Sequence, residues 1–283
     1  MSAMDGSGED PLSRLEATVR AQVLKFLAQV IPRSEQRDRA RWREAPFSSE
    51  WRSYLLRNVP HYSELDASSR HELERQVLVF VNEKRFEGCA GFEITDEVRV
   101  TIAGQACLLS LSRDLDFYPR LRVILVYPDA FVARYARFTS PQPHQEIHDP
   151  RLGESWGKGV VVLSWSGIRD GSATLGEFRN VVAHEFAHQL DQEDGAADGI
   201  PLIDGAHTYR VWARLIADEF EQHVARLEGG EETVLDAYGA TNRAEFFAVA
   251  VEAFFERPRD FRAERPELYG LLRDYFNQDP AGR

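Results

Sequence analysis

Residues 181–191 read VVAHEFAHQLD and contain the spacing H-E-x-x-H at His184, Glu185 and His188. In a helix, residues four apart share a face, so both imidazoles could bind one metal ion. Glu185 lies beside them and could take a proton from a water on that ion. No Pro or Gly interrupts residues 178–190, which predicts a continuous active-site helix. The alternative is a surface helix whose His and Glu side chains are merely solvated.

The two histidines leave such a site one protein ligand short, because a catalytic zinc keeps three protein ligands and one open position. A third histidine at the spacing H-E-x-x-H-x-x-G-x-x-H is excluded, since Asp191 and Asp194 stand where the Gly and the His would fall. A downstream carboxylate is therefore favoured. The helical pattern at 241–257 offers Glu245 in its first turn and Glu252 on nearly the same face.

The pattern around this helix predicts a mostly helical α+β protein. Two short Val-rich runs, 122–127 and 159–165, predict the buried strands of a small sheet. Residues 31–60 are rich in charge, Pro and Ser and predict a loop with short helical pieces. The predicted helices span 12–31, 69–84, a stretch capped by Thr95, 176–192, 205–227, 241–257 and 265–276.

The composition limits the classes of function. A formal charge of −12 over 283 residues, without a basic patch, argues against direct nucleic-acid binding. The opening residues 1–10 are small, polar and acidic, unlike a secretory signal, and no apolar run is long enough to cross a membrane. Cys89 and Cys107 lack C-x-x-C spacing and indicate neither a metal motif nor a disulfide framework. A cytoplasmic location is expected.

The chain resembles the zinc-dependent peptidase family of the Mlc titration factor A proteins and, more distantly, the catalytic domain of anthrax lethal factor. The likeness is carried by residues 184–191 and by YGATNRAEFFA at 238–248. It extends to EKRFEGC at 83–89, IAGQAC at 102–107 and GVVVLSW at 159–165, and so covers roughly residues 70 to 277.

The resemblance implies a zincin-like metallopeptidase domain at 69–283, preceded by an N-terminal helical or irregular portion at 1–68, the two expected to form one compact unit. It implies one Zn²⁺ per chain, bound by His184, His188 and Glu245. Glu185 is then the general base and Tyr238 a donor to the developing oxyanion. For Tyr238 alone, core packing is an equal alternative.

The sequence allows more than one role for the other polar residues near the motif. Glu252 could be a rival ligand or an acceptor for a ligand imidazole. Asp191 could accept the free N–H of such an imidazole, or it could end the helix together with Asp194 and face solvent. His144, His148 and His207 could approach the cleft, although isolated histidines are more often surface or packing residues.

Three functions fit these residues. The first is a zinc peptidase in which Glu185 activates the zinc-bound water, with peptide or protein substrates and, as the resemblance implies, an aminopeptidase-like action. The second, which the resemblance implies, is a regulatory binding protein that sequesters a transcriptional repressor controlling sugar uptake. The third is a metal-bound scaffold without turnover. Binding alone would need neither Glu185 nor Tyr238, so their presence favours the peptidase.

Overall fold

The elements of the fold come from a computed structural model, which describes residues 36–112, 118–129, 159–173, 180–203 and 205–283. In chain order they are α2 (Gln36–Arg43), α3 (Ser49–Asn58), η1 (Pro60–Glu64), α4 (Ala67–Glu83), β1 (Arg85–Gly88), α5 (Asp96–Ser110), β2 (Val123–Tyr127), β3 (Val160–Ser164), α7 (Trp165–Ala173), α8 (Val181–Asp191), α9 (Ala206–Glu228), η3 (Ala237–Ala240), α10 (Arg243–Glu256), α11 (Pro258–Glu264), α12 (Pro266–Phe276) and η4 (Pro280–Gly282). The predicted helix at 12–31 and the first residues of the one at 176–192 lie outside the described residues.

The sheet has three strands in the order β1-β2-β3, and both neighbouring pairs are parallel. Arg85 pairs with Val123, and Val123 pairs with Val160, so the strands begin at a common edge. All residues of β2 and β3 are buried, as their Val-rich sequences predict. Parallel neighbours require a crossover connection, and α5 lies in the one between β1 and β2. The described part of the chain is therefore mostly helical with a small parallel sheet, which confirms the predicted α+β class.

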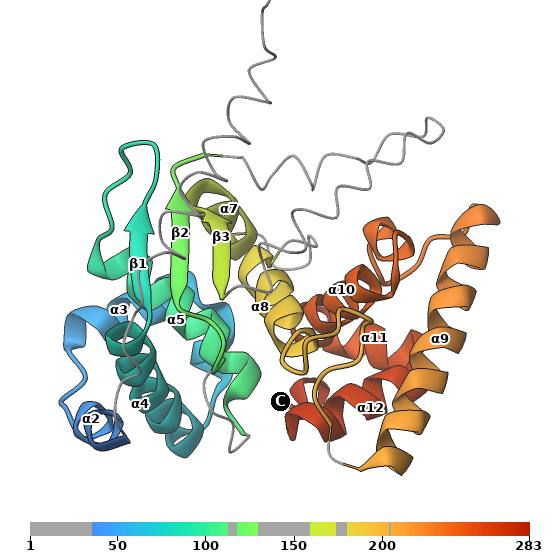
Figure 1. Ribbon diagram of the computed structural model, residues 1–283, viewed down its shortest axis with the longest axis horizontal. Coiled ribbons are helices and arrows are strands. Elements are labelled where there is room, and N and C mark those ends of the chain that lie inside the picture. The colour runs from blue at the N-terminus through green and yellow to red at the C-terminus, as the bar shows by residue number, and fades with distance from the viewer. Residues whose placement is uncertain (1–35, 113–117, 130–158, 174–179, 204) are drawn as a thin grey trace, which may run out of the picture.

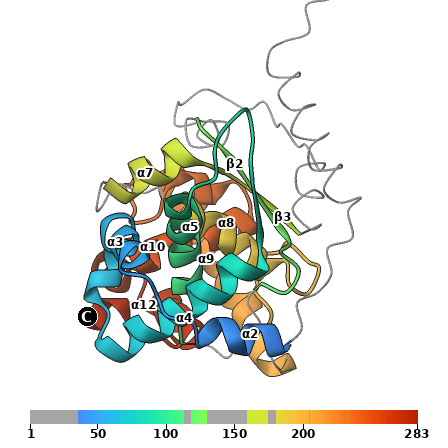
Figure 2. The ribbon, with the colours of Figure 1, turned by 90° about the vertical axis from the view of Figure 1, so that its left-hand side faces the viewer.

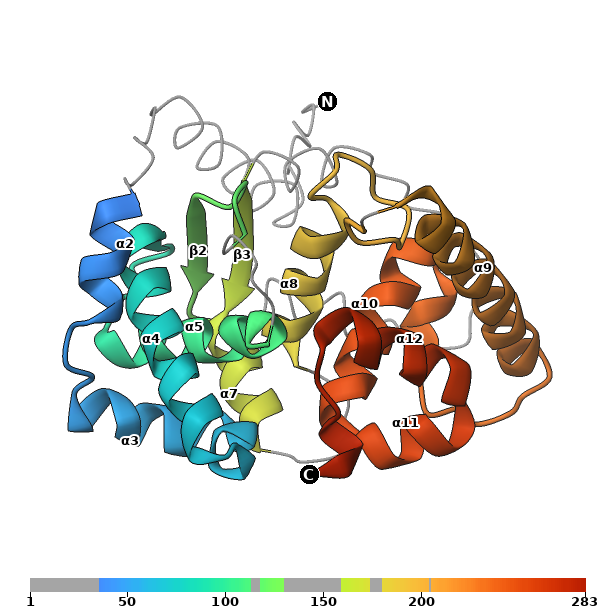
Figure 3. The same cartoon turned by 90° about the horizontal axis from the view of Figure 1, so that it is seen from below.

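Helix α8 lies at the middle of the molecule. Figures 1 and 3 show it between the sheet with α2–α5 and the C-terminal helices α9–α12. It contacts β3, α5 and α7 on one side and packs extensively against α10 on the other. Figure 2 shows α5 and α8 on the same face of the strands. The helix with the H-E-x-x-H motif thus has packed neighbours on both sides.

The helices near the site begin where their capping residues predict. The Thr95 side chain accepts a hydrogen bond from Val98 N at the start of α5. The Asn242 side chain likewise accepts a hydrogen bond from Glu245 N at the start of α10. These local bonds fix the first turn of each helix and place Glu245 in the first turn of α10.

Several elements differ from the sequence prediction, and one of them, the helix α7, was not predicted at all. The strand β1 was not predicted either, because four residues with one buried position are too few to show a strand period. In the region 31–60 the expected short helical pieces are α2 and α3, which account for most of its described residues. Pro258 ends α10 as expected but also begins α11, because the fixed φ of proline and its missing N–H suit the first position of a helix.

One cluster of buried apolar side chains connects α8 to its surroundings. Phe186 is 0% exposed, and its ring centroid lies 4.7 Å from that of Tyr118 and 5.8 Å from that of Phe80. From α10, Phe254 packs 5.6 Å from Phe276 of α12. Both aromatic groups belong to the same cluster, so the two helices that meet at the site share one core.

Within the described residues, no helix combines the length and the apolar character that crossing a bilayer requires.

Candidate metal centre

The two motif histidines project from α8 on one face. Asn180 caps the helix by accepting a hydrogen bond of 2.9 Å from Ala183 N, so the motif lies within regular helix. The ring centroids of His184 and His188 are 4.9 Å apart, and their side chains are 15% and 12% exposed. The opposite side of α8 carries Phe186 into the core. Burial of that side fixes the direction in which the imidazoles point.

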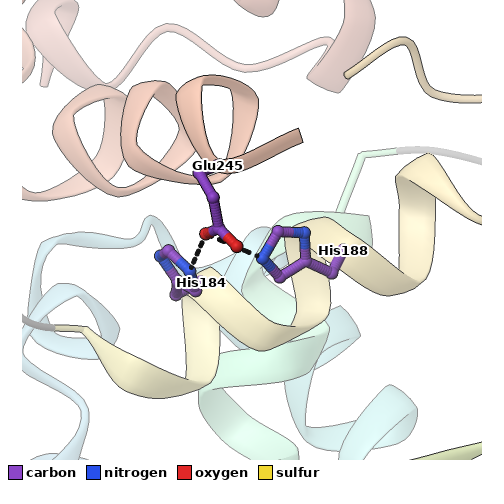
Figure 4. Close-up of side chains that lie close together, drawn as sticks. All are labelled: His184, His188 and Glu245. Carbon is purple, nitrogen blue, oxygen red and sulfur yellow. Dashed lines mark hydrogen bonds and ion pairs between the residues drawn. The ribbon is translucent and has the colours of Figure 1, made fainter. Parts of the chain in front are cut away.

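Glu245 meets both histidines from the first turn of α10 (Figure 4). Its Oε2 lies 3.0 Å from His184 Nε2 and 3.2 Å from His188 Nε2. Burial alone would raise the pKa of Glu245, but the two imidazoles hold it well below its ordinary range. The structure therefore brings together the three residues that the resemblance implied as ligands, with one ligand-type atom from each within 4.8 Å of the others.

The donor set fits a zinc ion. Ligand atoms bound to one zinc at about 2.0–2.1 Å in tetrahedral geometry stand roughly 3.3 Å apart. The separations of 3.0 and 3.2 Å between Glu245 Oε2 and the two Nε2 atoms are close to this value. Two imidazoles and one carboxylate are a common protein donor set for catalytic zinc, whereas Mg²⁺ and Ca²⁺ prefer oxygen ligands. Among the described residues, no other group of His, Cys, Asp and Glu side chains is arranged to hold a metal ion.

Behind the ligands, α10 presents further carboxylates to α8. Glu252 Oε1 lies 2.6 Å from His184 Nδ1, and Glu256 Oε1 accepts a hydrogen bond of 2.8 Å from Asn180 Nδ2. Glu245, near the start of α10, contacts His188 near the end of α8, and Glu256, at the end of α10, contacts Asn180 at the start of α8. The two helices are therefore antiparallel at this contact. This pairing settles the position of Glu252: it contacts the imidazole of His184 through Nδ1, whereas Glu245 lies at Nε2.

Glu185 is the most buried member of the motif, with 8% of its surface exposed. Burial raises the pKa of its carboxyl to about 7, although the neighbouring imidazoles of His184 and His188 act in the opposite direction. A bound dication would lower this value, because a nearby positive charge favours the carboxylate. A carboxyl with a pKa near neutrality is suited to both accepting and returning a proton.

Tyr238 lies beside the histidines, on the short helix η3. The Asp236 side chain accepts a hydrogen bond of 2.8 Å from Tyr238 N and so fixes the start of η3. The half-buried ring of Tyr238 has its centroid 6.0 Å from that of His184. Since η3 also packs against α10, the phenol belongs to the same group of elements as the ligands.

Asp191 is the last residue of α8, as one of the two alternatives expected, but its carboxylate contacts neither solvent nor an imidazole. It is 0% exposed, so it does not face solvent, and its Oδ1 accepts hydrogen bonds of 2.9 Å from both Gly199 N and Ile200 N. Burial raises its pKa to about 6, and the charge of His188 opposes this. Asp191 thus holds the chain that follows α8. Asp194 does lie on an exposed turn, where it accepts a hydrogen bond from Ala196 N.

The remaining histidines lie apart from this cluster or outside the described residues. His207 is exposed at the start of α9, and His144 and His148 are not among the described residues. Two buried histidines, His61 and His223, contact Glu256 and the carbonyl of Asp236, respectively. Glu256 and His61 were missed from the sequence. Glu256 had a signal, because it lies one helical turn beyond Glu252 on the same face.

Comparison with known proteins is consistent with this geometry. Residues 33–277 match the model of a family described as glucose-regulated metallo-peptidase M90. An uncharacterized protein of Synechocystis sp. (strain PCC 6803) is 41% identical over 84% of this chain and 89% of its own length. Mlc titration factor A of Klebsiella pneumoniae is 31% identical over 80% of this chain and 85% of its own, and that of Cronobacter sakazakii is 31% identical over 81% and 86%.

Proposed function

The chain belongs to the M90 family of glucose-regulated metallopeptidases, and from this premise we propose that it is a zinc-dependent peptidase. The observation that carries the proposal is the convergence of His184, His188 and Glu245 from two packed helices. In this proposal all three bind one Zn²⁺ and leave its fourth position open. Zinc, when bound there, supplies a Lewis acid that polarises a carbonyl and lowers the pKa of water.

Glu185 acts as the general base. It follows His184 directly, so its carboxylate is held beside the ligands by the same helix. It takes a proton from the attacking water and later gives that proton to the leaving amine of the peptide. Both transfers need a carboxyl whose pKa is near the working pH, and burial moves the pKa of Glu185 in that direction.

Tyr238 stabilises the transition state. As the peptide carbonyl becomes tetrahedral, its oxygen gains negative charge, and a phenol O–H donated to that oxygen is worth most at that moment. The support for this role is the position of the ring, half-buried and 6.0 Å from His184 between ring centroids. A purely packing role for Tyr238 would predict normal turnover after removal of the hydroxyl.

The finer description of the enzyme is also a proposal. We assign a zincin-like arrangement, in which the motif helix packs beside the sheet and a downstream helix supplies the third ligand. In this proposal residues 69–283 are the metallopeptidase domain, and residues 1–68 are a separate portion that precedes it. An aminopeptidase-like preference is proposed from the family resemblance.

A second candidate is regulatory binding. The relatives from Klebsiella and Cronobacter are named Mlc titration factor A, a name that describes the titration of Mlc. By analogy, this chain would sequester a transcriptional repressor that controls sugar uptake. The two functions are compatible, because partner binding does not require Glu185.

The test begins with the metal content of protein purified without added metal or chelator. We expect close to one zinc per chain in the wild type and in Glu185→Gln, and loss of zinc in His188→Ala and Glu245→Ala. Hydrolysis of a mixed-sequence peptide library should occur only in the wild type, because Glu185→Gln keeps the ligands and removes the base. Zinc absent from wild-type protein that also binds none on titration would contradict the central proposal. Zinc with hydrolysis undiminished in Glu185→Gln would contradict the mechanism alone.

A further inference from the structure

The loop that follows α8 passes close to the start of α10 before the chain enters α9. We define the brace loop as residues 192–200, which follow Asp191 and precede the buried Pro201. Its far end is held in the core, because Ile200 is only 5% exposed. Its near end is held by Arg120, whose Nη1 donates a hydrogen bond of 3.4 Å to the carbonyl of Gln192. The loop therefore has fixed ends on the described part of the fold.

The first contact of the brace loop is with α8. Asp191, the last residue of α8, accepts hydrogen bonds of 2.9 Å from the N–H groups of Gly199 and Ile200 through a single oxygen, Oδ1. The carboxylate is fully buried, so water does not compete for these bonds. Asp191 follows His188 by three residues and lies in the same rigid helix. Any movement of Gly199 relative to α8 must therefore break or stretch these bonds.

The second contact is with α10. Gly199 has φ +81°, and a Cβ placed on it would lie 2.3 Å from the carbonyl oxygen of Arg243 and 2.8 Å from the carbonyl carbon. Arg243 is the first residue of α10, two positions before Glu245. The backbone of Gly199 thus approaches the first turn of α10 more closely than any side chain would allow.

We propose that Gly199 is a positioning residue for the metal centre. Through Asp191 and Arg243 it spans the end of α8 and the first turn of α10, and so sets the spacing between His188 and Glu245. This inference rests on the proposed zinc site and adds to it a residue that touches no ligand. The separation it controls is the 3.2 Å between His188 Nε2 and Glu245 Oε2.

A methyl group at this position has nowhere to go without moving the loop or the first turn of α10. The obstructing atoms belong to the backbone of Arg243, which cannot rotate away as a side chain could. If the first turn of α10 moves away from α8, the ligand spacing changes directly. If the loop separates from Asp191 instead, the contact that sets this spacing is lost, and small errors in ligand placement weaken metal binding.

The test compares Gly199→Ala with a matched control, Gly230→Ala. Gly230 also has a positive φ, +74°, but a Cβ there would meet nothing within 4 Å. Both variants incur the conformational cost of alanine at positive φ, and only the first meets the backbone of α10. Zinc affinity is measured by competition with a chromophoric chelator. The visible spectrum of the Co²⁺-substituted protein reports the geometry of the ligands, and thermal unfolding of the metal-free proteins reports folding.

We expect Gly199→Ala to bind zinc about 10-fold or more weakly than the wild type and to change the Co²⁺ spectrum, as changes behind a ligand do. Gly230→Ala should match the wild type in both. Equal zinc affinity and an equal spectrum in the two variants would overturn the inference. If wild-type protein binds no zinc, the proposed metal site itself fails, which is a distinct result.

A second pair of variants covers the case in which Gly199→Ala does not fold. Asp191→Asn keeps an oxygen for the two backbone N–H groups, whereas Asp191→Ala removes it. We expect Asp191→Ala to lose zinc affinity by about 10-fold or more and Asp191→Asn to recover most of it. Equal zinc affinity in these two variants and the wild type would contradict the proposal that the brace loop positions the ligands.

Discussion

His184 is held between two carboxylates: its Nδ1 lies 2.6 Å from Glu252 Oε1, while its Nε2 lies 3.0 Å from Glu245 Oε2. Both ring nitrogens thus meet a carboxylate, and which of them carries a proton depends on what binds the ring. If a metal takes the lone pair of Nε2, as in the proposed site, Nδ1 carries the proton and donates it to Glu252. In that state Glu252 would orient the imidazole and increase its basicity.

The first prediction concerns this orientation. Glu252→Gln keeps the shape of the side chain and removes its charge, so the zinc affinity should fall about 10-fold or more. The matched control is Glu256→Gln, one turn further along α10, where the partners are His61 and Asn180 and no ligand is contacted. Competition titration with a chelator measures the zinc affinity of both variants. Equal affinities in the two variants would show that Glu252 does not act through His184.

The second prediction distinguishes a role of Tyr238 in turnover from a role in metal binding. Tyr238→Phe should keep the zinc content of the wild type and lower kcat about 100-fold or more, with a small change in KM, because the hydroxyl acts only as charge develops. Steady-state kinetics on a peptide that the wild type cleaves would measure this. An unchanged kcat would return Tyr238 to the packing role that its sequence also allowed.

The third prediction concerns the core beneath the motif. Phe186 lies between the two ligand histidines in sequence, and its fully buried ring packs against Tyr118 and Phe80. Phe186→Ala should lower the free energy of unfolding by about 3–5 kcal/mol, whereas Phe186→Leu, which keeps more of the volume, should cost less. Urea unfolding of the metal-free proteins measures the difference. Similar losses in the two variants would indicate that the cavity collapses around either side chain.

Much of the fold near the site could be predicted because its signals are local. The caps at Thr95 and Asn242 and the spacing of the motif act within one helical turn, so they are readable without knowing what packs against them. The strand β1 was missed because its stability comes from pairing with β2, almost forty residues away in sequence.

The residues of the site also divide into those that could be predicted from the sequence and those that depend on the packing of the fold. His184, His188 and Glu245 were assigned together because the resemblance pairs two separated motifs, and the structure brings the same three side chains to one point. The place of Glu252 was left open, since it depends on α10 packing antiparallel to α8. The role of Asp191 was also left open, because its partners, Gly199 and Ile200, are backbone groups of a folded-back loop, and a sequence carries no pattern for such bonds.

The last prediction concerns pH and the start of α8. His61 of η1 is buried, with Nδ1 3.2 Å from Glu64 Oε2 and Nε2 3.4 Å from Glu256 Oε2. Glu256 also accepts the hydrogen bond from Asn180, the cap of α8. Protonated His61 thus stabilises a carboxylate that helps to hold the motif helix.

Burial alone would lower the pKa of His61, but the two carboxylates raise it above the ordinary value of 6.5. The folded protein therefore binds this proton more tightly than the unfolded chain does, and the resulting stability is fully present below about pH 6.5 and is lost as pH rises through the folded-state pKa. His61→Gln should remove this loss, so that the stabilities of the two proteins converge as pH rises. Urea unfolding of metal-free wild type and variant at a series of pH values from about 6 to 9 tests this. Parallel stability profiles would show that the pKa of His61 is the same in the folded and unfolded protein, so that its contact with Glu256 contributes no proton-linked stability.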